Sequence, residues 1–99
     1  MQDNPNEVVR AHILVRGRVQ GVGFRAYVES EAQQLGISGW VRNVGSDIVE
    51  AFAEGRREIV EQFVEAVRQG PRMARVDEST VDWEAATGEF TGFGVKRNI

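Results

Sequence analysis

The sequence contains no cysteine and a single histidine, His12, which narrows the chemistry open to the chain. Without cysteine there can be no disulfide framework, no thiolate nucleophile and no sulfur-ligated metal site. One histidine also disfavours a histidine-rich zinc or iron centre. No apolar run approaches the roughly 20 residues that a membrane-spanning helix requires. We therefore expect a soluble, cytoplasmic protein with no membrane partner and no cofactor or metal.

The length and composition predict a single domain. The chain has 99 residues, of which 41% are hydrophobic, and this is enough to build one sizeable core. Residues 1–7 are polar and include Pro5, so we expect a flexible tail there and not a signal peptide. The domain itself should then span residues 8–99.

Charge is distributed unevenly along the chain. The net charge of −3 is opposite in sign to the basic surface that nucleic-acid-binding proteins usually present. Between Arg10 and Arg25, however, there are four arginines and no acidic residue, and all fifteen acids lie elsewhere. A local basic segment on an acidic protein favours a focused site for a small anion. Chance clustering on a solvated strand is the alternative, and charge alone leaves it open.

Hydrophobic periodicity predicts alternating strands and helices. The expected strands are 8–16, 37–44, 48–54 and 74–85, with a short final strand at 90–97, and the expected helices begin at Phe24 and near Ile59 and end at Gly36 and Gly70. This order, β-α-β-β-α-β plus a terminal strand, predicts a ferredoxin-like α+β sandwich. In that fold two helices cover one face of an antiparallel sheet.

Two finer expectations concern side chains on these elements. Val76 is out of phase with Val81 and Trp83, which predicts a β-bulge in the strand at 74–85. His12 lies opposite the apolar side of the first strand, where we expect it to be exposed or packed beside an arginine. The aromatic residues recur at helix or strand spacing and are expected in the core: Tyr27, Trp40, Trp83 and the phenylalanines.

The topology brings two distant segments together. In a split β-α-β unit the first two strands run parallel with the third between them, so their carboxyl ends share one edge of the sheet. The first strand is followed by the glycine-rich segment 17–23 and Arg25, and the second ends near Asn43. We therefore expect Arg25 and Asn43 to be neighbours.

The segment Gln20-Gly21-Val22-Gly23-Phe24-Arg25, called the 20–25 loop below, has the features of an anion site. Its glycines let successive N–H groups point inward, and the following helix directs its N-terminal amides at the same place. Arg25 adds a guanidinium fork that can bind two phosphate oxygens. We predict that these six residues bind phosphate, with Gln20 more suited to holding the loop shape than to touching substrate. A plain turn with a surface arginine is the alternative.

Two familiar phosphate motifs do not fit this segment. A P-loop requires lysine and then serine or threonine directly after its last glycine. Gly23 is followed by Phe24 and Arg25 instead. Gly21 and Gly23, with Ala26, are spaced like the dinucleotide fingerprint, but the second strand ends in Arg42-Asn43 where that motif places an acid. The chain is also too short for a doubly wound sheet.

Two stretches of the sequence resemble the signatures of the acylphosphatase family. Residues 15–25 match the first signature at every defined position, and residues 39–43, Gly-Trp-Val-Arg-Asn, with Val49 and Gly55, resemble the second. Gly70-Pro71 and residues 92–96 are also family-like, so the resemblance covers about residues 8–97. There are two departures. Asp47 stands where the family usually has glycine, although Gly45 offers another flexible point in that turn, and Lys96 replaces a more frequent arginine.

The resemblance implies a metal-independent enzyme that hydrolyses an acyl phosphate to a carboxylate and inorganic phosphate, acting as a monomer. It also implies that Arg25 and the 20–25 loop bind the phosphate while Asn43 orients the attacking water. The chemistry is coherent without a metal, because a carboxylate is a good leaving group and phosphoryl transfer depends mainly on positioning and charge neutralisation. An asparagine cannot act as a base, so we expect the proton to pass to the phosphate.

Two kinds of binding module share this order of elements and are the alternatives. RNA-recognition domains stack bases on aromatic residues of strands 1 and 3. Strand 1 has no aromatic residue here, and strand 3 lacks the basic-glycine-aromatic pattern, so we expect no nucleic-acid partner. A regulatory domain that binds a small anion without hydrolysing it is the second alternative. It predicts stabilisation by phosphate with no turnover.

Overall fold

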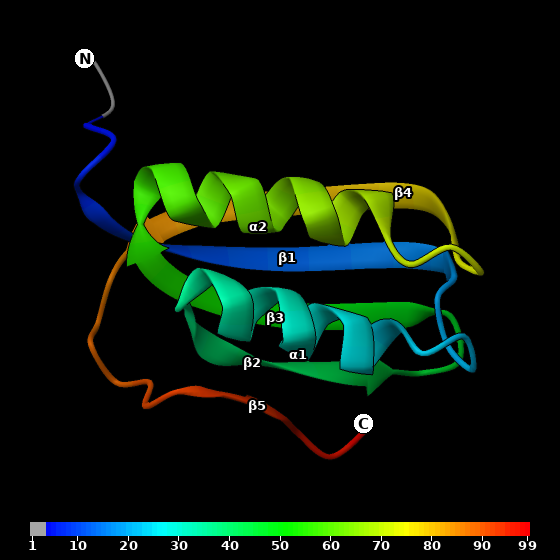
Figure 1. Ribbon diagram of the computed structural model, residues 1–99. Coiled ribbons are helices and arrows are strands. Elements are labelled where there is room, and N and C mark those ends of the chain that lie inside the picture. Colours follow the sequence, from blue (N-terminus) through cyan, green and yellow to red (C-terminus); the bar gives the residue numbers. More distant parts are fainter. Residues whose placement is uncertain (1–3) are drawn as a thin grey trace.

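The chain folds into two helices packed on one face of a five-stranded sheet (Figure 1). The structure is a computed structural model and describes residues 4–99. Its elements in order are β1 (Val8–Arg18), α1 (Phe24–Leu35), β2 (Ser38–Val44), β3 (Ile48–Arg56), α2 (Arg57–Gln69), β4 (Arg75–Ala85) and β5 (Phe93–Val95). The predicted order and the ferredoxin-like α+β class are confirmed.

The strand order in the sheet is β4-β1-β3-β2-β5. β3 lies between β1 and β2 and is antiparallel to both, so β1 and β2 run in the same direction. β4 is antiparallel to β1, whereas β5 is parallel to β2 and makes the sheet a mixed one. The carboxyl ends of β1 and β2 therefore lie together, at the right-hand end of Figure 1.

The final strand is shorter than the predicted 90–97. β4 and β5 lie at opposite edges of the sheet, so the chain between them must cross the whole end of the sheet. Residues 86–91 make this crossing, which leaves three residues, Phe93–Val95, as β5. The chain reaches β2 just before β5, where the carbonyl of Gly92 accepts the amide of Gly39 at 2.9 Å. Beyond β5 the chain still follows β2, since the amide of Lys96 donates to the carbonyl of Val41 at 2.8 Å.

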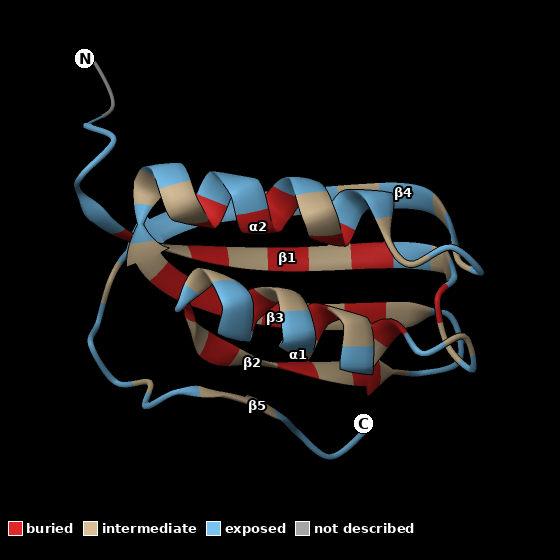
Figure 2. Ribbon diagram, in the orientation of Figure 1, coloured by how far each residue is buried: buried red, intermediate tan, exposed pale blue. Residues whose placement is uncertain are grey.

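The core lies between the sheet and the two helices (Figure 2). Buried residues alternate along β1, β2 and β3 because successive side chains of a strand point to opposite faces. The helices contribute buried residues at helical spacing: Phe24, Val28 and Ala32 from α1, and Val60, Phe63, Val64 and Val67 from α2.

The expectation that the aromatic residues form the core is right for Phe24 and Phe63 and wrong for several others. Trp40 and Phe52 lie on the helix-free face, because each occupies a strand position between two that face the helices. Trp83 is on the helix side of the sheet, but it lies on an edge strand and is 39% exposed.

His12 lies opposite the apolar side of β1, as predicted, and is half-buried there. Its ring stacks on Phe52 with centroids 4.1 Å apart. Its ring N–H donates to Glu50, with 2.6 Å between Nε2 and Oε2, and Glu50 also accepts from Arg42 Nε at 2.8 Å. The partners of His12 are therefore an aromatic ring and a carboxylate of β3.

The predicted β-bulge is present in β4. Arg16 pairs with Glu78 and Gly17 pairs with Val76, so Asp77 is an extra residue on β4. The extra residue shifts the side-chain alternation by one position. For this reason Val76 and Val81 both pack against the core despite their odd spacing.

Part of the expected N-terminal tail contacts α2. The amide of Arg57 donates to the carbonyl of Glu7 at 2.8 Å, and that of Glu58 donates to the carbonyl of Pro5 at 3.1 Å. These carbonyls serve amides of the first turn that have no acceptor inside the helix. Residues 4–7 thus cap α2, while residues 1–3 of the expected tail lie outside the described residues.

Candidate active site

The loop between β1 and α1 turns sharply at two glycines. Gly21 and Gly23 have φ angles of 74° and 76°, in the left-handed region that favours glycine. Gly23 is also the N-cap of α1, and its carbonyl accepts the amide of Tyr27 at 3.0 Å. The amides of the first helical turn have no acceptor within the helix and remain open to a ligand.

Gln20 joins this loop to the turn between β2 and β3. Its side-chain amide donates to the carbonyls of Val44, Gly45 and Ile48 at 3.3, 3.1 and 3.0 Å. The Gly17 amide adds a backbone bond to the carbonyl of Asp47 at 3.0 Å. These contacts fit the role that sequence analysis favoured for Gln20, which is to hold the shape of the loop.

The turn between β2 and β3 has its flexible point at Gly45. Gly45 has a φ of 61°, whereas Asp47 has no positive φ. The conformation that glycine supplies is therefore displaced two residues upstream of Asp47. The Gly45 amide donates to the carbonyl of Ile99 at 2.7 Å, which attaches the end of the chain to this turn.

Arg25 lies in the first turn of α1 and is half-buried. Its Nη1 donates to Asn98 Oδ1 at 2.8 Å. No described carboxylate forms an ion pair with Arg25, so its charge is not cancelled and most of its N–H donors stay open. Asn98 was not identified from the sequence, where nothing distinguishes it from other residues of a polar chain end.

Asn43 lies near the end of β2 with its side chain toward the helices, and it is 6% exposed. Its backbone carbonyl accepts the amide of Ile99 at 3.1 Å. Its side-chain Oδ1 is buried, and no donor within residues 4–99 reaches it. A buried acceptor without a partner is uncommon in proteins because of its desolvation cost, and it marks a position suited to a ligand or water.

Arg25 and Asn43 line the same cavity, of about 360 Å³, so the expectation that they are neighbours is confirmed. That volume is near the lower end of the about 300–1,000 Å³ typical of small-molecule sites. Val22 does not line the cavity and packs against the core instead. The full lining is Val19, Gln20, Gly21, Gly23, Phe24, Arg25, Ala26, Glu29, Asn43 and Val95. Sequence analysis did not identify Glu29 or Val95.

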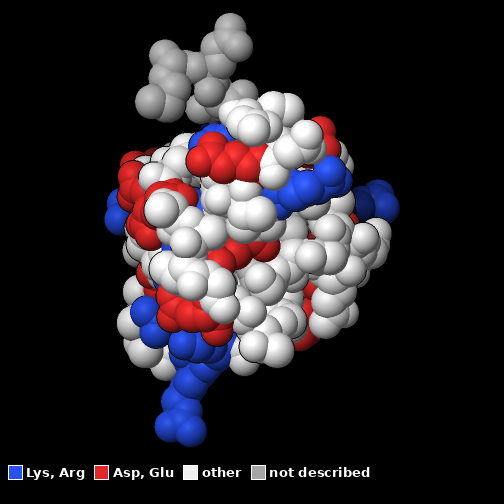
Figure 3. All heavy atoms as spheres, turned by 90° about the vertical axis from the view of Figure 1, so that its left-hand side faces the viewer, with Lys and Arg blue, Asp and Glu red and all other residues white. Residues whose placement is uncertain are grey.

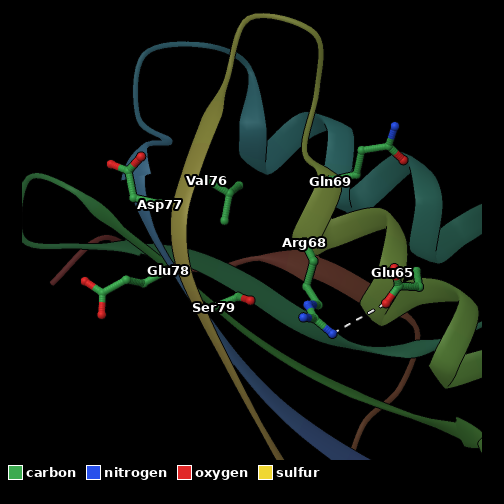
Figure 4. Close-up of a pocket in the computed structure, with 7 residues that line it drawn as sticks. All are labelled: Glu65, Arg68, Gln69, Val76, Asp77, Glu78 and Ser79. Atoms are coloured by element: carbon green, nitrogen blue, oxygen red, sulfur yellow. Dashed lines mark hydrogen bonds and ion pairs between the residues drawn. The ribbon is translucent and has the colours of Figure 1, made fainter.

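A second hollow, of about 390 Å³, lies between α2 and β4 (Figure 4). Its walls carry three carboxylates, Glu65, Asp77 and Glu78, against a single cation, Arg68. Arg68 is in turn 3.5 Å from Glu65. The excess of negative charge makes this hollow unfavourable for a phosphate compound.

The helix-free face of the sheet carries aromatic rings that are covered by the chain's own cations. The Trp40 ring is 4.9 Å from the Arg42 guanidinium carbon and 4.6 Å from Lys96 Nζ, and the Phe52 ring is 4.4 Å from the Arg10 guanidinium carbon. An RNA-recognition module needs open rings on this face for base stacking.

At the end of the molecule away from the cavity, acidic and basic side chains are interspersed (Figure 3).

The described residues offer neither a metal centre nor a membrane span. Within residues 4–99 no three His, Asp or Glu side chains are grouped so as to hold a metal ion. Neither α1 nor α2 is long and apolar enough to cross a membrane.

Comparison with known proteins identifies the family. Residues 11–95 match the family model Acylphosphatase. The acylphosphatase of Anaeromyxobacter sp. strain Fw109-5 is 51% identical over 90 residues, which cover 91% of this chain and 97% of that protein. The chain belongs to the acylphosphatase family. A second acylphosphatase, from Roseiflexus sp. strain RS-1, is 46% identical over 89 residues, 90% of this chain and 96% of that protein.

Structural comparison agrees. The crystal structure of acylphosphatase from Bacillus subtilis superposes with a TM-score of 0.85 at 36% identity, covering 89% of this chain and 98% of that one. As a member of this family, the protein is an enzyme that hydrolyses the carboxyl–phosphate anhydride of acyl phosphates, releasing a carboxylate and inorganic phosphate.

Proposed function

We propose that the cavity between Arg25 and Asn43 is the active site for this hydrolysis. One observation carries the proposal: a guanidinium with no described carboxylate partner and a buried, unpartnered amide oxygen line the same cavity. The guanidinium suits the oxygens of a phosphate, and the Asn43 Oδ1 acceptor suits a hydrogen of water.

The phosphoryl group is bound by the 20–25 loop and Arg25. The left-handed turns at Gly21 and Gly23 let backbone amides converge on an anion, beside the positive end of the α1 dipole. Val22 and Phe24 direct their side chains into the core, so they contribute backbone amides alone. Gln20 likewise acts through its backbone, because its side chain is bonded to the β2–β3 turn.

Asn43 positions the attacking water. Its Oδ1 accepts one hydrogen of the water, which directs a lone pair of the water oxygen at the phosphorus. The new O–P bond forms as the P–O bond to the acyl group breaks, and the carboxylate leaves with the electron pair. The water proton passes to a phosphoryl oxygen, because the asparagine amide cannot take it.

The proposed mechanism uses no metal, because the charge that develops is neutralised by protein groups. Arg25 and the backbone amides act on the phosphoryl oxygens, and this kind of positioning and charge stabilisation is the main requirement of phosphoryl transfer. The leaving group needs no general acid, since carboxylic acids ionise at a pKa of about 4.

Phosphate release from benzoyl phosphate in the presence of EDTA tests the proposal. We expect wild-type turnover to survive EDTA and Arg25→Gln to be nearly inactive. Asn43→Ala should lose at least the roughly 10²–10³-fold in rate that follows loss of one hydrogen-bond partner of the transition state. Inhibition by inorganic phosphate should be lost in Arg25→Gln and kept in Asn43→Ala, because Asn43 acts on the water. Near-normal rates in either variant would contradict the assignment.

We further propose that the enzyme acts as a cytoplasmic monomer and takes no nucleic acid. A single chain supplies Arg25, the loop and Asn43, so no second copy is needed to complete the cavity. Acyl phosphates are charged and stay in the compartment where they form. Light scattering of the purified protein tests whether it is a monomer. A gel shift with single-stranded RNA tests whether it binds nucleic acid.

A further inference from the structure

We propose that Glu29 determines which acyl groups the enzyme accepts, by disfavouring those that carry a second negative charge. This inference rests on the proposed active site and concerns the part of the cavity that the phosphate does not fill. Glu29 lines the cavity together with Arg25 and is half-buried.

The position of Glu29 on α1 places it at the acyl end of the cavity. Residues four apart on a helix share one face, so Glu29 lies beside Arg25 and about one turn, roughly 5–6 Å, further from the helix N-terminus. The phosphate is bound at that N-terminus. The acyl group must extend away from it, along a wall that contains Glu29 and the apolar Val95, which is 45% exposed.

The charge of Glu29 is not balanced by a described partner. No hydrogen bond or ion pair involves its carboxylate within residues 4–99, in contrast to Glu50 and Glu54 on the sheet. Arg25 and Glu29 are the charged residues of the cavity lining. The cavity thus has a cationic end for the phosphate and an anionic wall beyond it.

This arrangement discriminates by charge. An acyl group with its own carboxylate places two negative charges a few ångströms apart in a partly solvated site, which lowers kcat/KM by about threefold to tenfold. An acyl group that carries an ammonium gains by a similar factor. Both effects should shrink as added salt screens the charges.

Three benzoyl phosphates that differ in the charge at the para position measure the effect: their para group is a neutral methyl, an anionic carboxylate or a cationic aminomethyl. We expect Glu29→Gln to raise the ratio of kcat/KM for the carboxylate compound to that for the methyl compound by about threefold to tenfold. The ratio for the aminomethyl compound to the methyl compound should fall by a similar factor. Glu31→Gln is the matched control, because it makes the same charge change on α1 outside the cavity lining. It should leave both ratios as in the wild type.

The outcomes separate this inference from the proposed function. If Glu29→Gln changes kcat/KM by the same factor for all three substrates, Glu29 acts through Arg25 and the specificity role is wrong. It is also wrong if both ratios stay within twofold of wild type, or if Glu31→Gln shifts them as much. Arg25→Gln is assayed in parallel. If Arg25→Gln retains wild-type rates on the methyl compound, the active-site assignment itself fails, whatever the ratios show.

Discussion

Arg25 Nη1 donates to Asn98 Oδ1 at 2.8 Å, which joins the first turn of α1 to the segment that follows β5. The acceptor is a neutral amide oxygen, so the contact orients the guanidinium without cancelling its charge. The next residue, Ile99, donates its amide to the carbonyl of Asn43. Two consecutive residues at the end of the chain therefore contact both residues to which we assign the chemistry.

Replacing Asn98 should weaken phosphate binding through Arg25. We expect Asn98→Ala to raise the inhibition constant for inorganic phosphate a few-fold, because the guanidinium loses one restraint. Asn98→Asp should raise it further, by about tenfold, since a carboxylate beside Arg25 competes with the phosphate for its charge. Asn6→Ala, at the far end of the molecule, is the control. Equal phosphate inhibition in all four proteins would show that Asn98 does not position Arg25.

Gln20→Ala should reduce both stability and activity. The substitution removes an NH₂ group that three carbonyls share and releases the loop from the β2–β3 turn. Each lost hydrogen bond of this kind costs about 0.5–1.5 kcal/mol, so we expect roughly 1–2 kcal/mol from urea unfolding after solvent compensates in part. Phosphate affinity should fall with kcat/KM. Activity lost without any change in phosphate affinity would argue that the Gln20 side chain acts on substrate directly.

The turn behind Asn43 should depend on Gly45 and not on Asp47. Gly45→Ala forces a side chain into the left-handed region and should cost about 1–2 kcal/mol, with lower kcat because the backbone of Asn43 and Ile99 shifts. A Cβ there meets nothing within 4 Å, so the cost is conformational and Gly45→Asn should recover part of it. Asp47→Ala is the matched control, with an expected effect within about 0.5 kcal/mol. A larger effect at Asp47 would contradict the observed turn.

Glu54 should be the most important carboxylate for stability. It is 5% exposed and accepts three hydrogen bonds, from the amide and hydroxyl of Thr87 and the amide of Gly88. Glu54→Ala leaves these donors unsatisfied and should cost roughly 2–3 kcal/mol in urea unfolding. Glu84→Ala removes an exposed carboxylate 3.6 Å from Arg10 and should cost less than about 1 kcal/mol.

The same residue predicts the response to acid. Burial acts to raise the pKa of Glu54, but the hydrogen bonds from Thr87 and Gly88 outweigh it and hold that pKa below its usual value. A lowered folded-state pKa contributes stability above the unfolded value of about 4.3, and this contribution is lost as pH falls through the folded value. The stability difference between wild type and Glu54→Gln should therefore narrow below about pH 4. A constant difference from pH 7 to pH 2 would contradict this account.

Much of the fold was predictable because its signals are local. Alternation in β1, the helical spacing from Phe24 and the glycine at position 36 each fix an element or its end within a few residues. The topology rule then placed Arg25 near Asn43, and the clash of phase at Val76 identified the bulge. These inferences needed no knowledge of distant contacts.

The errors in predicting the core arise because both faces of the sheet carry large hydrophobic side chains. Trp40 and Phe52 are as hydrophobic as a core residue, and only the register of their strands puts them on the helix-free face. There His12, Arg10 and Arg42 cover the rings, an arrangement that no short sequence window contains. Asn98 was missed for a similar reason, since its contact with Arg25 spans 73 positions of sequence.

The two ends of the described chain lie at opposite ends of the molecule (Figure 1). Asn4 to Glu7 lie against the first turn of α2, whereas Ile99 is bonded to Asn43 and Gly45. A fusion partner attached through the N-terminal segment is therefore expected to leave the proposed active site unobstructed. The same fusion partner joined after Ile99 emerges beside Arg25 and Asn43. The position of the fusion partner is therefore expected to affect the measured kcat/KM.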